Sequence, residues 1–178
     1  MKRHRIAATM AIVFGFTLVG GMGSPALAEG NEAFGFNAPL VSGFSGGRAV
    51  EVTGGGAYSL PDFVHSGGGF RCLSDITAGP FNGCLTGQGV RWDTAMLLPD
   101  PPNGFKCTGA ATEALKTVPT GDKTVVLLAD FYRQGDGNDE SFTAQMIVSE
   151  TDLADDIEGV QNVWIQGVGC GPAIANFN

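Results

Sequence analysis

The sequence predicts an all-β protein, either an antiparallel sandwich or a small barrel of about eight short strands with little helix. Apolar runs rich in β-branched and aromatic residues recur along the chain, separated by turns rich in Gly, Pro and Asn. Good helix formers stand together only over residues 110–116, a stretch that suits one helical turn or a weak strand. Four cysteines add a covalent framework to this β-rich pattern.

The strongest single element is a hairpin over residues 123–150. Two β-favouring runs flank a cluster of Gly, Asp and Asn at 134–140, whose residues favour tight turns. The first arm, 125–131, is apolar at both odd and even positions, which predicts a central strand buried on both faces. In the second arm, 142–149, apolar and polar residues alternate, which predicts a half-buried antiparallel strand.

Two similar passages, 52–58 and 64–70, each run from a valine into three successive glycines and an aromatic residue. Their spacing suits consecutive strands of a meander joined near 60–62, and the glycines predict bulges or tight coiling instead of flat pairing. Ser149 to Asp152 has the form of a helix cap followed by a single helical turn. Three more stretches are expected as strands: 89–98, 160–168 and 173–177.

Residues 1–28 have the form of an export signal peptide. Three basic residues precede an apolar core at 6–19, and small residues at 26–28 supply a cleavage site before Glu29. A transmembrane anchor is the alternative, but the apolar core is short for a span of about 20 residues and glycines follow it directly. We therefore expect a secreted, extracellular protein with no membrane insertion after signal cleavage.

Signal cleavage would leave 150 residues, which is enough for one domain with its own core. We expect a Gly- and Asn-rich N-terminal arm at 29–47, either mobile or held by its phenylalanines, and a single disulfide-stabilised β domain at 48–178. Seven Lys and Arg against eighteen Asp and Glu then give a net charge of −11. Such an acidic chain repels nucleic acid and anionic lipid surfaces, so neither is an expected partner.

All four cysteines, Cys72, Cys84, Cys107 and Cys170, follow the expected cleavage site. An even number in an exported protein predicts two disulfides. Zinc is the alternative, but its ligands usually come as close pairs, and the nearest two cysteines here are twelve positions apart. Three pairings fit the sequence. We favour Cys72–Cys84 and Cys107–Cys170, because the first closes a short turn-rich loop and the second ties the last strand to the middle of the chain.

The acidic hairpin tip is the candidate metal site. Its oxygen-bearing side chains are Asp136, Asn138, Asp139 and Glu140. Their spacing begins like a calcium loop of the EF-hand type but departs from it at Ser141 and Ile147, so Asp152, Asp155 or Asp156 would have to complete the site. A solvated turn is the favoured alternative, because Gly, Asn and Asp form such turns without a metal. Apart from this candidate calcium ion, no cofactor is expected.

Side chains suited to catalysis are scarce. His65 is the single histidine after the signal, and Asp62 and Ser66 are too near it in sequence to complete a Ser–His–Asp triad. With one histidine and bridged cysteines, a transition-metal centre lacks ligands. Adjacent acids such as those at 139–140 and 155–156 point to opposite faces of a strand, so adjacency does not make an acid–base pair. Three large aromatic residues fit a sugar-binding face or a core: Trp92, Tyr132 and Trp164.

Three stretches resemble exported, β-rich bacterial proteins of actinobacterial type that are uncharacterised: GVRWDT at 89–94, LADFYRQGDGNDESF at 128–142 and VWIQGVGCG at 163–171. The resemblance covers most of the chain from about residue 52. It implies secretion and one β domain. Because those proteins carry no assigned activity, the resemblance transfers no catalytic residues.

Two classes of function remain open. The leading hypothesis is a non-catalytic binding module for a small ligand or an extracellular partner, and a barrel with an apolar lumen would favour a hydrophobic ligand. The alternative is a secreted hydrolase that acts through carboxylates, with or without calcium. A pocket holding two convergent Asp or Glu side chains, or His65 bonded to an acid and a hydroxyl, would favour the hydrolase.

Overall fold

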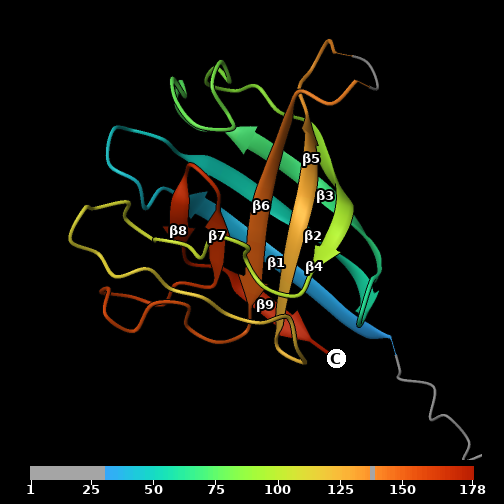
Figure 1. Cartoon of the computed structure of the whole chain (residues 1–178). Helices are drawn as coiled ribbons and strands as arrows, with labels where there is room; N and C mark the ends of the chain where they lie inside the picture. The colour runs from blue at the N-terminus through green and yellow to red at the C-terminus, as the bar shows by residue number, and fades with distance from the viewer. Residues whose placement is uncertain (1–30, 137–138) are drawn as a thin grey trace, which may run out of the picture.

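The computed structural model describes residues 31–136 and 139–178, so the expected signal peptide lies outside the described residues. The described residues form no helix and a single, strongly curled antiparallel sheet (Figure 1). This confirms the all-β prediction. The strands are β1 (Glu32–Val41), β2 (Val50–Ser59), β3 (Phe63–Cys72), β4 (Arg91–Leu98), β5 (Thr124–Tyr132), β6 (Phe142–Ser149), β7 (Val163–Ile165), β8 (Gly169–Gly171) and β9 (Ile174–Phe177). Their order across the sheet is β8-β7-β6-β5-β4-β3-β2-β1-β9.

The first strand lies where an N-terminal arm was expected. Residues 32–41 form β1, which pairs with β2 on one side and β9 on the other, so the domain begins well before residue 48. Phe34, Phe36 and Ala38 are buried in the core, whereas the Gly and Asn residues between them face outward. The polar positions that resemble a linker are therefore the outer face of a half-buried strand.

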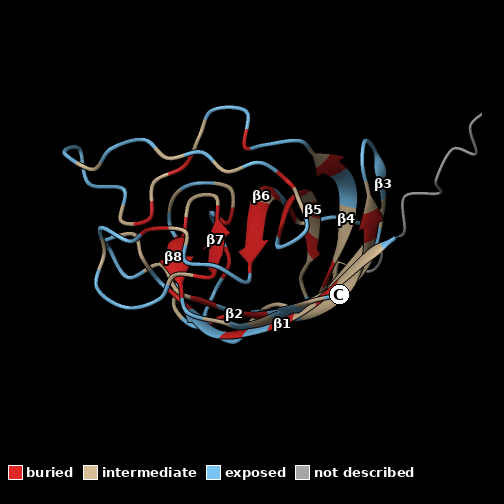
Figure 2. Ribbon diagram, turned by 90° about the horizontal axis from the view of Figure 1, so that it is seen from below, coloured by how far each residue is buried: buried red, intermediate tan, exposed pale blue. Residues whose placement is uncertain are grey.

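The two ends of the sheet meet. β9 and β8 lie at opposite edges, yet the N–H groups of Ser42 and Phe44, just after β1, donate to the carbonyls of Cys170 (3.3 Å) and Val168 (2.8 Å). Only two residues separate β8 from β9, so both run along the same side of β1 and its extension. The sheet thus curls into a barrel-like shape, with β1 and β2 forming one wall opposite β6, β7 and β8 (Figure 2).

The interior of the curl is filled by buried aromatic and aliphatic side chains. Phe81 packs edge-on against Phe131 with ring centroids 4.8 Å apart, and Phe36 lies 6.0 Å from Trp92. These rings occupy the space in which an apolar ligand lumen would lie. Trp92 also donates its indole N–H to the Thr53 carbonyl (3.0 Å), which fixes the ring between β2 and β4.

A second core lies outside the sheet, under the long segments after β4 and β6. Val126 and Ile147 face outward from β5 and β6 and pack with Trp164 of β7 and with residues of these segments, Phe105 among them. The first half of β5 is therefore buried on both faces, as its continuous apolar run predicts, because a covering layer replaces solvent on its outer side (Figure 2).

One disulfide is local and the other joins distant segments of the chain. Cys72 bonds Cys84 and Cys107 bonds Cys170, the two pairs that the spacing favours, and the described part of the chain holds no free cysteine. The first closes the loop between β3 and β4, and the second ties β8 to the covering segment after β4. A bridge over a loop of the first size stabilises the fold by about 3 kcal/mol.

Turns replace the two short helices that the sequence suggests. Residues 110–116 and 149–152 contain no helix. Asp152 does act as a cap, because its Oδ1 accepts the N–H groups of Ala154 and Gln161, both at 3.0 Å, but it closes a loop instead of starting a helix. Within residues 31–136 and 139–178, no helix is long and apolar enough to cross a membrane.

The glycine triplets of β2 and β3 allow the sheet to coil tightly. A Cβ atom at Gly54 would lie 2.5 Å from both Trp92 Cζ2 and the carbonyl oxygen of Gly67. Similar contacts below 3.0 Å with neighbouring strands would meet a Cβ at Gly55, Gly56, Gly67 and Gly68. Backbones approach too closely here for any side chain, which confirms tight coiling as the structural role of these five glycines.

Candidate functional site

A shallow pocket of about 360 Å³ lies on the outer face of β2 and β3, beside the segment that enters β4. Its polar side chains are Glu51 and Thr53 from β2 and Arg71 from β3. Gly69 forms the floor, and Val90 forms an apolar wall. This volume is in the range of sites for small molecules.

The alternation of two adjacent strands places these residues together. Val50, Val52, Phe70 and Cys72 are buried in the core, so the residues between them in β2 and β3 point outward. The antiparallel register then sets two cross-strand pairs: Glu51 with Arg71 and Thr53 with Gly69. Residues opposite each other in such a pair have Cβ atoms about 5 Å apart, so the pocket is a compact square of four positions.

Gly69 differs from the other five glycines of the triplets. A Cβ atom at Gly69 would have its nearest neighbours at 3.6 Å (Val90 O) and 3.8 Å (Thr53 Cγ2), which is ordinary van der Waals contact. Its φ is also not positive. Neither packing nor backbone conformation requires glycine at this position, although glycine weakens a strand. The missing side chain instead leaves the pocket open.

The charges of the pocket are unpaired. Arg71 is the one Lys or Arg side chain of residues 31–136 and 139–178 without a hydrogen bond or salt bridge in that part of the chain. Although Glu51 lies directly opposite on β2, the two side chains form no ion pair. Thr53 donates its hydroxyl hydrogen to the Phe36 carbonyl of β1 (3.0 Å), and its methyl carbon Cγ2 faces the Gly69 position on β3.

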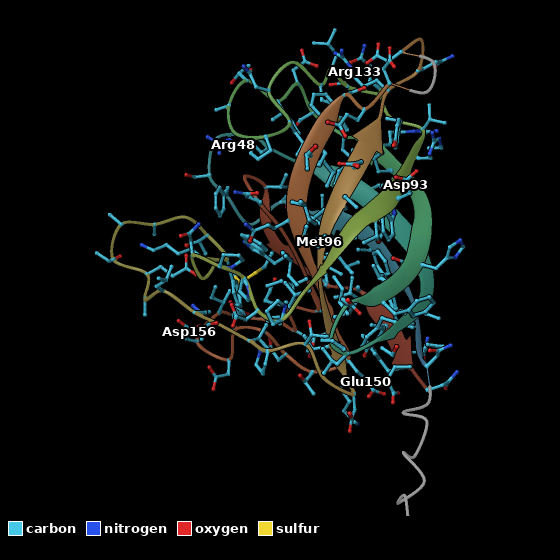
Figure 3. The ribbon with its side chains drawn as sticks, turned by 45° about the vertical axis from the view of Figure 1, so that its right-hand side comes forward. Arg48, Asp93, Met96, Arg133, Glu150 and Asp156 are labelled. Atoms are coloured by element: carbon cyan, nitrogen blue, oxygen red, sulfur yellow. A yellow bond between two sulfur atoms is a disulfide. The ribbon has the colours of Figure 1, made fainter. Side chains whose placement is uncertain are left out.

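A neighbouring polar cluster on β4 and β5 satisfies itself. The Arg91 guanidinium lies over the Tyr132 ring at 3.8 Å and bonds Asp93 Oδ2 at 2.5 Å. Tyr132 donates its hydroxyl to the other oxygen of Asp93 (3.2 Å), and Asp93 projects from β4 in Figure 3. Burial and the Asp93 carboxylate raise the pKa of the Tyr132 phenol. This cluster has no free charge and borders the pocket without lining it.

At the hairpin tip, the predicted metal site, the described contacts are those of Asp136 within a turn. Asp136 accepts the Ser141 hydroxyl (2.5 Å) and the Arg133 Nε–H (3.1 Å), and these two contacts lower its pKa. The backbone N–H of Asp139 donates to the Asp136 carbonyl (3.2 Å), as in a simple turn. Asn138 lies outside the described residues. Within the described ranges, no three His, Cys, Asp or Glu side chains are placed to share a metal ion, and calcium binding stays a prediction.

Completion of that site by the three later aspartates is wrong on geometric grounds. The tip precedes β6, whereas Asp152, Asp155 and Asp156 follow it. The eight residues of β6 separate the two ends by about 25 Å at the usual rise of a strand. Figure 3 shows this separation, with Arg133 near the tip and Asp156 at the far end of the domain. Asp156 instead pairs with Lys116 at 3.1 Å.

The other sequence candidates do not gather into a catalytic site. His65 lies on β3 opposite Ala57, and its ring bonds no other described residue. The neighbouring Ser66 hydroxyl bonds the Thr94 hydroxyl. Trp92 and Trp164 are buried and donate their indole N–H groups to backbone carbonyls, so they belong to the two cores and not to a sugar-binding face.

Sequence reasoning missed the pocket. Alternation along 50–52 and 70–72 identifies the outward residues of each strand, but only the register between the strands brings Glu51 opposite Arg71. One signal was present in the sequence. Gly69 and Arg71 stand two positions apart in one strand and so share a face, which places a residue without a side chain beside a charged one.

The fold and pocket define a disulfide-stabilised β domain with a polar surface site. Comparison with known proteins finds no matching family model, no matching curated protein and no matching solved structure.

Proposed function

We propose that this chain is a secreted, non-catalytic binding domain that takes a small polar ligand in the pocket over Gly69. The observation that carries the proposal is the open floor at Gly69, where glycine has no packing role, beside the unpaired charges of Glu51 and Arg71. Unpaired polar groups around a hollow that lacks a side chain offer a ligand directional contacts without displacing existing bonds.

The distribution of carboxylates favours binding over hydrolysis. Hydrolysis by acid–base chemistry requires two carboxyl groups that face one cleft. The pocket contains a single carboxylate, Glu51. The nearby acids of the outer face are engaged elsewhere, Asp93 with Arg91 and Tyr132, and Asp130 with the Thr143 hydroxyl (3.0 Å).

Secretion is supported by independent features of the chain. The export signal form of residues 1–28 suits an extracellular protein, and so does the net charge, which is −8 for the whole chain and −11 without those residues. Two disulfides form readily only in an oxidising compartment. An exported domain with a small surface pocket would act by capturing a ligand outside the cell.

Ligand screening with two matched glycine variants tests the proposal. The chain from residue 29 is screened by thermal melting against amino acids, sugars and small carboxylic acids. A ligand at one hundred times its Kd stabilises the folded state by about 2.7 kcal/mol, which raises Tm by about 5–10 °C. Gly69→Val should fill the floor and abolish the shift. Gly35→Val is the control, because a Cβ there meets only Gly54 O, at 3.9 Å, on the same outer face.

The two variants give opposite expectations. Binding that survives in Gly69→Val would place the ligand elsewhere and contradict the proposal. Equal loss in both variants would indicate a general effect on the sheet, and it would contradict the proposal as well. Loss of the ligand-induced Tm shift in Gly69→Val but not in Gly35→Val, with an unchanged fold by circular dichroism, supports binding in the pocket.

A further inference from the structure

We infer that the pocket over Gly69 binds a free α-amino acid with an apolar side chain, as a zwitterion. This inference rests on the proposed function and specifies its ligand. It follows from how hydrogen-bond acceptors, donors and apolar surface are distributed around the floor. Each wall of the pocket has a different chemical character.

The β2 wall offers only acceptors. Glu51 presents a carboxylate, whereas Thr53 directs its hydroxyl to Phe36 O of β1 and its methyl group toward Gly69, so the carboxylate is the polar group of this wall. The two residues stand at positions i and i+2 and share one face of the strand. An ammonium group carries three donors and a positive charge, which match this wall.

The β3 wall offers only donors. Arg71 presents a guanidinium with no partner among the described residues, and its planar fork suits a carboxylate. Arg71 lies directly across from Glu51, so the Cβ atoms of these two oppositely charged residues are about 5 Å apart. The ammonium and carboxylate of an α-amino acid are attached to one carbon atom, and this spacing allows both to be engaged at once.

The remaining wall is apolar. Val90 is 53% exposed and lines the pocket next to Gly89. It lies just before β4, on the side of β3 away from β2. Burying part of this surface against an aliphatic side chain is favourable. A neutral sugar would leave both charges unmatched, and a dicarboxylate would place its second charge against Glu51.

The probes are L-leucine and two relatives that each lack one charge. N-acetyl-L-leucine has no ammonium group, and L-leucinamide has no carboxylate. Binding to the chain from residue 29 is measured by calorimetry at low salt. L-leucine should bind, and each relative should bind about two- to fivefold more weakly, because each loses one exposed charged contact. Raising the salt concentration to 1 M should weaken L-leucine binding as well.

Charge variants assign each contact to its wall. In Glu51→Gln, L-leucine should fall to the affinity of N-acetyl-L-leucine, while discrimination against L-leucinamide persists. In Arg71→Gln, L-leucine should fall to the affinity of L-leucinamide, while discrimination against N-acetyl-L-leucine persists. Arg48→Gln is the control, because Arg48 bonds the Gly167 carbonyl away from the pocket.

The outcomes separate this inference from the proposed function. Equal binding of L-leucine and both relatives, or no leucine binding while a sugar or acid binds in a Gly69-dependent way, would overturn the amino-acid inference alone. Absence of every Gly69-dependent ligand in the screen would overturn both. The zwitterion is supported if Glu51→Gln binds L-leucine no more tightly than N-acetyl-L-leucine, and if Arg71→Gln binds L-leucine no more tightly than L-leucinamide.

Discussion

Replacing Glu113 with glutamine should destabilise the fold by about 1–2 kcal/mol at pH 7. The Glu113 side chain is 6% exposed and organises the covering segment after β4. Its carboxylate accepts N–H groups from Cys107 (2.6 Å), Thr108 (2.8 Å) and Gly109 (3.1 Å), and the Thr108 hydroxyl (2.6 Å). Lys116 Nζ lies 3.1 Å away. Glutamine keeps the size of the side chain but replaces one acceptor oxygen by a donor, so several of these bonds are lost.

The pKa of Glu113 gives the upper limit of this effect. Burial raises the pKa of Glu113, but the hydrogen bonds from Thr108, Cys107 and Lys116 outweigh burial and lower it from the usual 4.5 to about 2. A shift of this size corresponds to about 3 kcal/mol at 1.36 kcal/mol per unit. The segment borders solvent, and screening there reduces the effect, which leads to the smaller expected value.

The sign of the pH dependence follows from the lowered pKa. A carboxylate with a lower pKa in the folded state stabilises the fold above its unfolded pKa and loses this contribution as the pH falls through its folded pKa. The stability difference between the native chain and Glu113→Gln should therefore be constant above about pH 5. It should shrink between pH 4.5 and about pH 2.

Thermal melting and urea unfolding, followed by tryptophan fluorescence, measure the difference. For a domain of this size, 1–2 kcal/mol corresponds to a Tm lower by about 2–8 °C. Glu158→Gln is the matched control, because Glu158 is exposed and forms no salt bridge. A Tm of Glu113→Gln equal to that of the control, or a difference that does not change between pH 5 and pH 2, would refute the reasoning.

Three more predictions follow from single side chains. Gly54→Ala should cost about 1–3 kcal/mol in a thermal melt because its Cβ meets Trp92 Cζ2 at 2.5 Å, whereas Gly35→Ala should cost nothing; equal melting of the two would contradict tight coiling. Burial and two nearby carboxylates raise the pKa of Tyr58 to about 12, so ultraviolet titration should show a late ionisation that Tyr58→Phe removes, and stability should fall from pH 10 to pH 12. Millimolar calcium should leave Tm unchanged if the hairpin tip is a turn, and a rise that Asp136→Asn abolishes would establish a metal site.

Period-two alternation predicts most of the sheet from the sequence. The hairpin arms, the meander of β2 and β3, and β4 were all expected at nearly their observed positions. β1 was not, because its outward residues are those of a linker, although Phe34, Phe36 and Ala38 already alternate with them. The pattern was present, but Gly and Asn carried more weight in the interpretation than the spacing of the apolar residues.

Contacts between distant segments could not be predicted in the same way. Glu113 stands among good helix formers, and nothing local indicates that backbone N–H groups five and six positions earlier would surround its carboxylate. The hairpin tip illustrates the reverse case. Its acids resemble a calcium loop locally, but the length of β6 separates them from the aspartates that would complete the site.

The glycine triplets show why the site itself needed the structure. In the sequence, the six glycines of β2 and β3 form one pattern and invite one explanation. In the sheet, the space around each depends on the neighbouring strand: five have backbone or Trp92 atoms within 3.0 Å of a Cβ position, whereas the nearest atom to a Cβ at Gly69 lies at 3.6 Å. Coiling explains the five and does not explain the sixth. A residue that weakens its strand without serving the fold is best explained by what it leaves free, and at Gly69 that is the space between Glu51, Thr53 and Arg71.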